Sequence, residues 1–309
     1  MRIATAVSAA NRLIRPLGLR LDVLSSNGAI PDDVAVYLRP GNRRLRELRR
    51  RYAECDQAVT VSRQWHRWTL DRQQLRCFRG DNAYVWQRDG RASLALSARY
   101  LMSNDPMGLL DTVTEDGAFG AATEEVERRC FSRDLIDSIL ELSFLARHLP
   151  IATQSMSVVD IGAGYGRLAH RACAAFAGLT FACADAIPVS TFLSEFYLQY
   201  RSSRAQVIPL YDFRAPSADL ATNIHSFTEC TTAAVNWWLS RLGDVRHLFV
   251  VPNAMDHGGT RIINSEGHDL RPLIDAAGYR LVACEPKYAD SFVQRYGVQP
   301  TYHYLFERH

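Results

Sequence analysis

The chain has 309 residues, 47% of them hydrophobic and 22% charged, which is the balance of an ordinary folded protein with a buried core. Its formal net charge of +3 is too small to indicate a polyanionic partner, so the composition argues against nucleic-acid binding. No apolar run approaches the roughly 20 residues of a membrane helix, so we expect no transmembrane segment. A short apolar stretch at the N-terminus is followed at once by Asn11 and Arg12, which favours a cytoplasmic protein.

Two residue types have unusual counts. Of the 36 basic residues only Lys287 is a lysine, so the arginine run at residues 43–51 reflects a bias of the whole chain. Because Leu45 and Leu48 interrupt that run, we favour a solvated amphipathic helix over a site for an anionic ligand. The seven cysteines form no CxxC pair and several lie in apolar stretches, which predicts free thiols in a reducing compartment.

Residues 1–125 show an irregular pattern, for which we expect an N-terminal α+β region. The arginine-rich residues 43–53 have helical spacing, whereas residues 75–87 and 93–100 alternate like short strands next to turns. Residues 115–120 have the composition of a turn or loop.

From residue 126 onward, predicted strands and helices alternate in the rhythm of βαβ units. Ser132 is a good N-cap for a helix with an apolar face that ends near Pro150. The pattern predicts strands at residues 157–161, 179–184, 206–209, 219–223, 245–251, 279–284 and 301–306, and helices at 165–177, 189–200, 231–242 and 269–277. We therefore expect an α/β, Rossmann-like domain over residues 126–309, with a mainly parallel sheet and helices on both faces.

The first predicted strand of this domain leads directly into a glycine-rich loop. Glycines at 162, 164 and 166 follow a Val-Val-Asp-Ile strand and precede a predicted helix. Glycine is needed where a turn requires positive φ or where the backbone must touch a ligand. The loop therefore predicts a nucleotide-type ligand at the carboxyl end of the strand, next to the point where the chain reverses direction in the sheet.

Two acidic residues indicate which nucleotide. Asp185 ends the second predicted strand, 19 residues after Gly166, where a carboxylate can bind a ribose diol. The loop reads GxGxG with Arg167 next, not the GxGxxG of dinucleotide sites, and Asp160 stands two residues before the first glycine. A carboxylate there suits an ammonium group and repels a phosphate, which predicts S-adenosylmethionine. The alternative is that Asp160 only caps the following loop and the glycines only form a tight turn.

At this point the sequence resembles a bacterial family of sugar O-methyltransferases with a class I methyltransferase fold. The resemblance depends on four segments: the helix at 135–141, Asp-Ile-Gly-Ala-Gly-Tyr-Gly-Arg-Leu at 160–168, Asp-Ala-Ile-Pro at 185–188 and Asn-Ile-His-Ser-Phe-Thr-Glu at 223–229. The last segment is the most specific, although Cys230 stands where that family commonly has Met and His225 where a small or polar residue is usual. The resemblance implies methyl transfer to a hydroxyl of a polysaccharide, glycolipid or glycosylated metabolite.

Several residues are candidates for cofactor binding. After the third strand, Asp212 and Phe213 are suited to meet the adenine, although a strand-ending turn explains them equally well. The resemblance adds Asn223 to the site. The full candidate set comprises Asp160, Gly162, Gly164, Tyr165, Gly166, Asp185, Ala186, Ile187, Asp212, Phe213 and Asn223.

The candidate catalytic residues are His225, Glu229, Asp256 and His257, which follow the fourth and fifth strands. A sugar hydroxyl is a weak acid, so a base such as a near-neutral histidine is expected beside it. His225 alternatively bonds to backbone at a helix entry, and Glu229 alternatively forms a capping box with Ser226. Asp256 and His257 could join them around a divalent ion, but no diagnostic ligand spacing is present and we predict no metal.

The sequence therefore predicts an S-adenosylmethionine-dependent O-methyltransferase that acts on a sugar hydroxyl, with residues 1–125 covering the acceptor. A methyltransferase for a non-sugar hydroxyl is the first alternative, and a nicotinamide-dependent oxidoreductase is the second. The expected partner is a small-molecule or glycan acceptor. The sequence leaves open whether the chain forms a homo-oligomer.

Overall fold

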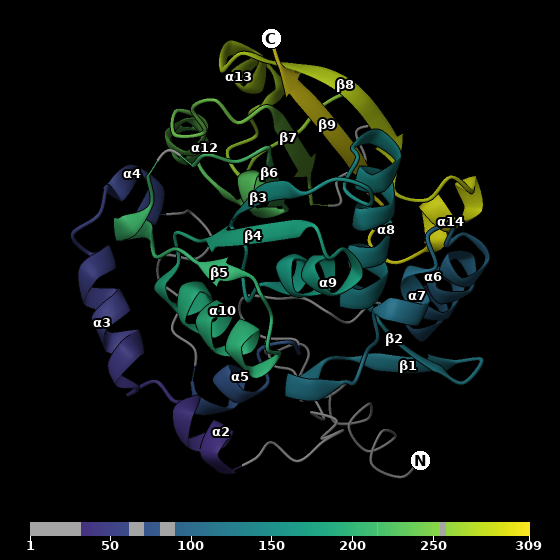
Figure 1. Ribbon diagram of the computed structural model, residues 1–309, viewed down its shortest axis with the longest axis horizontal. Helices are drawn as coiled ribbons and strands as arrows, with labels where there is room; N and C mark the ends of the chain where they lie inside the picture. The colour runs from purple at the N-terminus through teal and green to yellow at the C-terminus, as the bar shows by residue number, and fades with distance from the viewer. Residues whose placement is uncertain (1–31, 62–70, 81–89, 215, 254–257) are drawn as a thin grey trace, which may run out of the picture.

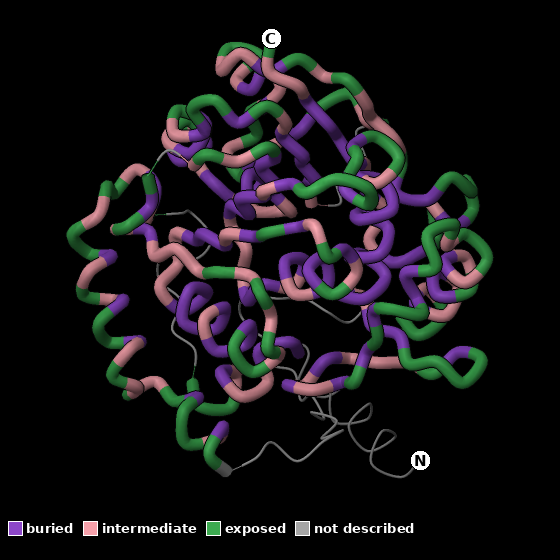
Figure 2. Tube along the Cα trace, in the orientation of Figure 1, coloured by how far each residue is buried: buried purple, intermediate pink, exposed green. Residues whose placement is uncertain are grey.

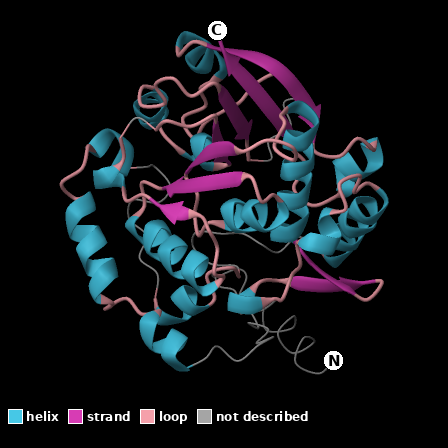
Figure 3. Ribbon diagram, viewed as in Figure 1, coloured by secondary structure: helices cyan, strands magenta, loops and turns pink. Residues whose placement is uncertain are grey.

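A seven-stranded sheet runs through the centre of the molecule, with a two-stranded sheet beside it (Figures 1 and 3). The computed structural model describes residues 32–61, 71–80, 90–214, 216–253 and 258–309. The strands are β1 (Thr123–Val126), β2 (Arg129–Ser132), β3 (Met156–Ile161), β4 (Leu179–Ala184), β5 (Gln206–Val207), β6 (Leu220–Ile224), β7 (His247–Val251), β8 (Tyr279–Pro286) and β9 (Tyr302–Arg308).

Helices precede, connect and flank these strands. The first half of the chain contains α2 (Asp32–Tyr37), α3 (Arg43–Tyr52), α4 (Gln57–Thr60), α5 (Arg72–Arg76), α6 (Arg91–Ser103), α7 (Leu109–Thr112), η2 (Ala118–Gly120) and α8 (Arg133–His148). The second half contains α9 (Arg167–Ala175), α10 (Pro188–Tyr200), η3 (Leu210–Asp212), α11 (Ser226–Glu229), α12 (Thr232–Leu239), α13 (Arg271–Ala276) and α14 (Ser291–Tyr296). None of the described helices is long and apolar enough to cross a membrane.

The large sheet has the strand order β5-β4-β3-β6-β7-β9-β8. Strands β3 to β7 are mutually parallel, whereas β9 runs antiparallel between β7 and β8. When the five parallel strands are numbered in chain order, from β3 as 1 to β7 as 5, their order across the sheet is 3-2-1-4-5. This is the order of a doubly wound α/β sheet. The chain therefore reverses direction between β3 and β6, and a ligand site is expected at the carboxyl ends of these two strands.

Two apolar cores cover the two faces of the large sheet, as the alternation of side chains along each strand requires. Val159 and Val250 belong to the core shared with α10, α12, α13 and the N-terminal helices α2 to α4. Val158 and Phe249, one residue away on the same strands, belong to the core shared with α6, α8 and α9. The buried positions accordingly concentrate in the strands and on the inner sides of the helices (Figure 2). The α/β prediction, with a mainly parallel sheet covered on both faces, is confirmed.

The predicted elements of residues 126–309 lie within a few residues of the observed ones. Ser132 is the N-cap of α8 and accepts a hydrogen bond from Leu135 N at 3.1 Å, as predicted. The proposed boundary at 125/126 falls within the β1–β2 hairpin, in which Val126 pairs with Arg129. The sequence pattern did not predict this hairpin.

The predicted strand at residues 93–100 is wrong, because these residues lie in helix α6. Leu94, Leu96 and Ala98 satisfy the period of a strand, but Leu94, Ala98 and Leu101 also form a helical stripe, and it is this stripe that is buried. Leu75, predicted in a strand, lies in α5, which begins with a capping box between Asp71 and Gln74. The rest of that prediction, from residue 81, lies outside the described residues.

The arginine-rich helix α3 is confirmed and lies beside α10, while α4 lies against α12 (Figure 1). Leu45 and Leu48 are fully buried, and Arg44 forms an ion pair of 2.6 Å with Glu195 of α10. The arrow of β4 points toward α3 and α4. These N-terminal helices therefore lie at the carboxyl-end side of the parallel strands. The seven cysteines, all in the described part of the chain, are free thiols.

Candidate functional site

The glycine loop after β3 uses each of its three glycines differently. All three have positive φ, at +70° for Gly162, +59° for Gly164 and +86° for Gly166. A β-carbon on Gly162 would lie 2.2 Å from Ser226 Oγ, so α11 packs directly on this residue. A β-carbon on Gly164 would meet no described atom within 4 Å, so open space lies in front of this residue. Gly164 is therefore the position where the loop backbone can contact a ligand.

Asp185, at the carboxyl end of β4, is bound to this loop. Its carboxylate accepts hydrogen bonds from Gly164 N at 3.0 Å and from Ile187 N at 2.8 Å. Ile187 is the N-cap residue of α10, and Ala186 and Ile187 are half-buried against the core. The structure therefore brings together the glycine loop and the Asp-Ala-Ile segment that the sequence assigned to one ligand.

Asp160 lies in β3, directly at the point where the chain reverses direction. Thr222 of β6 donates a hydrogen bond to its carboxylate at 2.7 Å, and only 3% of Asp160 is exposed. Burial raises the pKa of Asp160 to about 7, although the Thr222 hydrogen bond opposes this shift. Burial also raises the pKa of Asp185 to about 7, against the hydrogen bonds from Ile187 and Gly164. Two carboxylates whose ionised forms are under-stabilised would both gain from a cationic ligand.

Asn223, a predicted cofactor residue, uses both ends of its amide within the protein. Its Nδ2 donates to Ile161 O at 2.8 Å, and its Oδ1 accepts from Phe227 N at 2.8 Å. The side chain is fully buried. Asn223 therefore joins the end of β3 to the start of α11, so that its observed contacts position the loop.

His225 follows β6 and has an unusual backbone conformation for a residue with a side chain, at φ 67° and ψ −34°. Its Nδ1 donates to Pro252 O at 3.3 Å. This is the backbone hydrogen bond at a helix entry that the sequence analysis gave as the alternative to a catalytic role. The buried Nε2 has no hydrogen-bond partner among the described residues. Burial and then the charge of Arg133 lower the pKa of His225 to about 3, so the imidazole is neutral and Nε2 carries a lone pair.

Glu229 is the last residue of helix α11. Its Oε1 accepts a hydrogen bond of 2.9 Å from Asn253 Nδ2, at the end of β7. The capping box with Ser226 is wrong, because His225 is the N-cap residue and α11 has no side-chain capping hydrogen bond. Glu229 and Asp185 both follow the carboxyl ends of parallel strands, β6 and β4, so the two residues lie at the same end of the sheet.

Asp256 and His257, the other two candidate catalytic residues, lie outside the described residues. The remaining acidic, histidine and cysteine side chains of the described ranges include no group of three that could hold a metal ion. Any metal-assisted role for His225 or Glu229 is therefore left to experiment.

Three predicted cofactor residues have side chains placed away from the loop backbone. Tyr165 donates its hydroxyl to Asp134 on α8, so only its backbone belongs to the glycine loop. Phe213 is 4% exposed and packs edge-on against Trp238 at 5.1 Å, whereas Asp212 is exposed at the end of η3. An adenine contact of Asp212 or Phe213 stays a prediction.

Tyr52, which the sequence analysis missed, enters the site from the N-terminal helix α3. Its hydroxyl donates to Asp185 O at 3.2 Å and lies 2.7 Å from Thr191 Oγ1, and it accepts from Leu210 N at 2.9 Å. One phenol thus joins the ends of β4 and β5 to the start of α10. A tyrosine at the end of a predicted amphipathic helix carries no local signal of this role.

Sequence comparisons found no family model and no curated protein that matches this chain. Similar solved structures include the mitomycin 7-O-methyltransferase MmcR, with 19% identity over 57% of this chain and 55% of that chain and a TM-score of 0.43. Magnesium protoporphyrin IX methyltransferase from Synechocystis PCC 6803, solved with SAH, is 14% identical over 62% of this chain and 90% of that chain, with a TM-score of 0.44. The [4+2]-cyclase SpnF is 16% identical over 70% and 95%, with a TM-score of 0.42. Similarity at this level transfers no activity, so a function has to be argued from the site.

Proposed function

We propose that the chain is an S-adenosylmethionine-dependent O-methyltransferase. The observation that carries this proposal is the pair of buried carboxylates, Asp160 and Asp185, at the ends of adjacent strands around the open space at Gly164. S-adenosylmethionine brings a sulfonium and an ammonium group into such a site, together with a ribose diol. When bound, it supplies an electrophilic methyl group.

The charge of the site favours this cofactor over a nicotinamide dinucleotide. A pyrophosphate would lie next to two carboxylates that burial already disfavours in their ionised form, and like charges repel strongly where water is excluded. Asp185 is suited to accept hydrogen bonds from the ribose diol, and Asp160 to attract the ammonium group. Gly164 leaves room for the ligand beside the backbone.

His225 is the proposed base. Transfer to an alcohol breaks the S–CH3 bond, forms an O–CH3 bond and releases the hydroxyl proton, which His225 Nε2 would accept. The hydrogen bond from Nδ1 to Pro252 O holds the tautomer in which Nε2 is the acceptor. Nε2 is buried, so the acceptor hydroxyl has to displace the groups that cover it, and the pKa of His225, which burial lowers to about 3, has to rise for the imidazole to accept the proton near neutral pH.

A sugar hydroxyl is the proposed acceptor, and its support is the resemblance of residues 223–229 to the sugar O-methyltransferases. Residues 1–125 are the proposed cover of the acceptor site. The contacts of Tyr52 with the ends of β4 and β5 support this part of the proposal, because they bring α3 to the same end of the sheet. A non-sugar small-molecule hydroxyl is the alternative acceptor.

The proposal is tested by methyl transfer from labelled S-adenosylmethionine to a panel of sugars, glycoconjugates and non-sugar alcohols. We expect label in a sugar, with unchanged rates in the presence of a chelator. Label only in non-sugar alcohols would contradict the acceptor, and loss of activity in chelator would establish a metal. In parallel, calorimetry with S-adenosylhomocysteine and NADH separates the cofactors: binding of NADH alone would overturn the proposal.

The base is tested with His225→Ala. We expect turnover to fall by about 10²–10⁴-fold, the contribution typical of a positioned base, while S-adenosylhomocysteine affinity is kept. His247→Ala is the matched control, since His247 begins β7 at the opposite end of that strand. Equal turnover in both variants would eliminate His225 as the base.

A further inference from the structure

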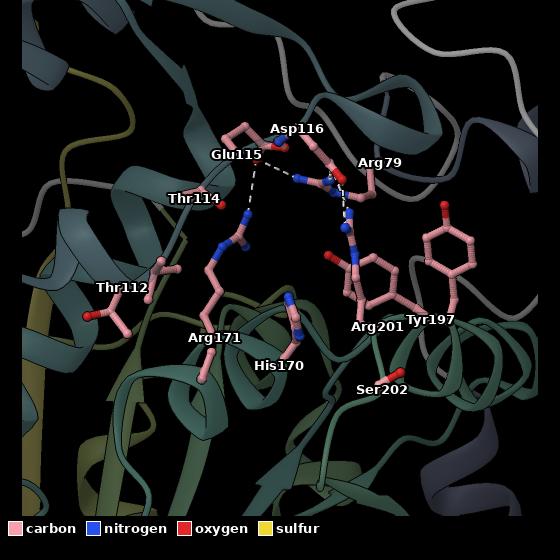
Figure 4. A pocket seen from close by; sticks show the side chains of 13 residues that line it. Arg79, Thr112, Thr114, Glu115, Asp116, His170, Arg171, Tyr197, Arg201 and Ser202 are labelled. Atoms are coloured by element: carbon pink, nitrogen blue, oxygen red, sulfur yellow. Dashed lines mark hydrogen bonds and ion pairs between the residues drawn. The ribbon is translucent and has the colours of Figure 1, made fainter.

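A pocket lies between helices α9 and α10 and the loop that precedes β1. Its volume is about 380 Å³, within the range of small-molecule sites. Figure 4 shows Arg79, Arg171 and Arg201 around the cavity, with Glu115 and Asp116 at one side and His170 pointing into it. Thr112, Thr114 and Tyr197 add further polar groups to the wall.

This pocket is separate from the proposed cofactor site. Helix α10 begins at Pro188, close to Asp185 and the glycine loop, whereas the pocket is lined by Tyr197 and Tyr200 of its last turn. The rise of an α-helix places Pro188 and Tyr200 about 18 Å apart. A ligand in the pocket would therefore lie near the far end of α10.

The three arginines are built into the fold. Arg79 is completely buried and Arg171 is 2% exposed, and both donate to Glu115 Oε2, at 2.6 Å and 3.0 Å. Arg201 forms a two-pronged ion pair with Asp116, at 2.6 Å and 2.9 Å. Since rigid, preorganised guanidinium groups lose little freedom on binding, they favour recognition of planar or tetrahedral oxyanions.

Not all hydrogen-bond donors of the pocket have acceptors. The wall carries three guanidinium groups and two carboxylates, those of Glu115 and Asp116, and Arg79 also pairs at 3.3 Å with Asp134, which does not line the pocket. Within the described part of the chain, the buried Nε atoms of Arg171 and Arg201 have no hydrogen-bond acceptor. A buried donor without an acceptor costs free energy, and an oxyanion in the pocket could supply the acceptors.

The pKa of His170 is affected by the same arginines. Burial and then the charges of Arg171, Arg201 and Arg79 lower its pKa to about 4, while Asp116 opposes them. At the position of His170 the arginine charges therefore outweigh the opposing charge of Asp116.

We propose that this pocket is a second binding site, which takes a small molecule through a carboxylate or phosphate group. Arg171 and Arg201 would bind the oxyanion through their Nε–H groups, with the threonine hydroxyls as further donors. The site goes beyond the proposed methyl transfer and does not depend on it, because no residue of the cofactor loop lines the pocket.

The test is calorimetric titration of the full chain with inorganic phosphate and, separately, with succinate, against sodium chloride at matched ionic strength. The two arms distinguish phosphate from carboxylate ligands. Arg201→Gln, which leaves the fully buried Arg79 and Arg171 in place, should weaken binding by about tenfold or more, because a hydrogen bond to a charged group is lost. Arg246→Gln is the matched control, because Arg246 also pairs with a carboxylate. Its partner is Glu307 of strand β9, and this pair lies at the protein surface.

Asp116→Asn changes binding in the other direction. It removes a competing carboxylate and frees Arg201, while its side-chain oxygen can still accept the hydrogen bond of 2.9 Å from Ala118 N. We expect tighter binding of the same anion in this variant. The proposal would be overturned if the wild-type chain bound neither anion or if Arg201→Gln bound the anion with unchanged affinity. It would also be overturned if Arg246→Gln lost as much affinity as Arg201→Gln.

Discussion

Gly162 and Ser226 approach so closely that a β-carbon on Gly162 would lie 2.2 Å from Ser226 Oγ. Gly162→Ala should therefore destabilise the fold by about 3 kcal/mol, because it adds a clash to a position that already requires positive φ. It should also weaken binding of S-adenosylhomocysteine, since α11 and the loop have to separate. Urea unfolding and calorimetry measure the two effects. Ser226→Gly in the same chain should recover part of the stability by removing the clash.

Gly164→Ala is the matched control for that prediction. Gly164 also has positive φ, but its β-carbon would enter open space, so only about 1 kcal/mol of stability should be lost. The added methyl group would occupy the space proposed for the cofactor, so affinity should still fall. A Gly164→Ala chain that binds S-adenosylhomocysteine as the wild type does would contradict the proposed position of the ligand.

The affinity for S-adenosylmethionine should rise with pH. Burial holds the pKa of Asp160 and Asp185 at about 7 in the free chain, so both carboxyls are largely protonated below that value. A bound cation stabilises their ionised forms, and binding therefore releases protons below about pH 7. Calorimetry from pH 5 to pH 8 in two buffers of different ionisation enthalpy measures the released protons. Asp160→Asn should lower their number, whereas an unchanged number would eliminate Asp160 as a ligand of the cationic group.

The stability of the free chain should follow the opposite trend. A carboxyl group with a folded-state pKa above its ordinary value of 3.8 contributes stability that is fully present below pH 3.8 and is lost as the pH rises to about 7. Asp160→Asn should therefore stabilise the free chain at pH 8 more than at pH 4. Thermal unfolding at both values, without ligand, measures this difference. A pH-independent effect of the substitution would show that Asp160 does not titrate in this range.

The sequence predicted the second half of the fold well because its strands are buried on both faces and its helices alternate with them. The first half contains few such signals. The stripe of Leu94, Ala98 and Leu101 in α6 fits two periods, and only burial against β1 and α8 selects the helix. The glycine loop and Asp185 could be predicted because their signal is local. The roles of Tyr52 and Asn223 could not, because each depends on contacts with segments that are distant in the sequence.

Tyr52→Phe tests how far the N-terminal region supports the cofactor site. Loss of the hydroxyl leaves Leu210 N without its acceptor and Asp185 O without this donor, so we expect a loss of about 1–3 kcal/mol in unfolding free energy. Affinity for S-adenosylhomocysteine should fall as the end of β4 loosens. Tyr37→Phe is the matched control, since the Tyr37 ring stacks on Phe192 of the same helix α10. Equal affinities of the two variants would confine Tyr52 to a structural role.

Lys287, the single lysine of the chain, is buried in an ion pair with Asp137 of α8 at 2.5 Å. Its ammonium group also donates to Val298 O at 2.7 Å and Gln299 O at 3.3 Å. Lys287→Met should cost about 3 kcal/mol, because it removes the closer of two cationic partners of the buried Asp137 carboxylate and leaves Arg133, at 3.3 Å. Lys287→Arg should also destabilise, since a planar guanidinium does not match three acceptors arranged around one atom.

The cost of Lys287→Met should shrink when Asp137→Leu is added, because the buried carboxylate that lost its closest partner is then removed as well. Arg246→Met is the matched control: its pair with Glu307 lies on the surface, where an ion pair contributes about 1 kcal/mol or less. Urea unfolding of the three variants measures these differences. If Lys287→Met cost no more than Arg246→Met, the buried pair would contribute no more to the fold than a surface one. In that case the three oxygen atoms around the ammonium group would not explain why this arginine-biased chain has a lysine at position 287.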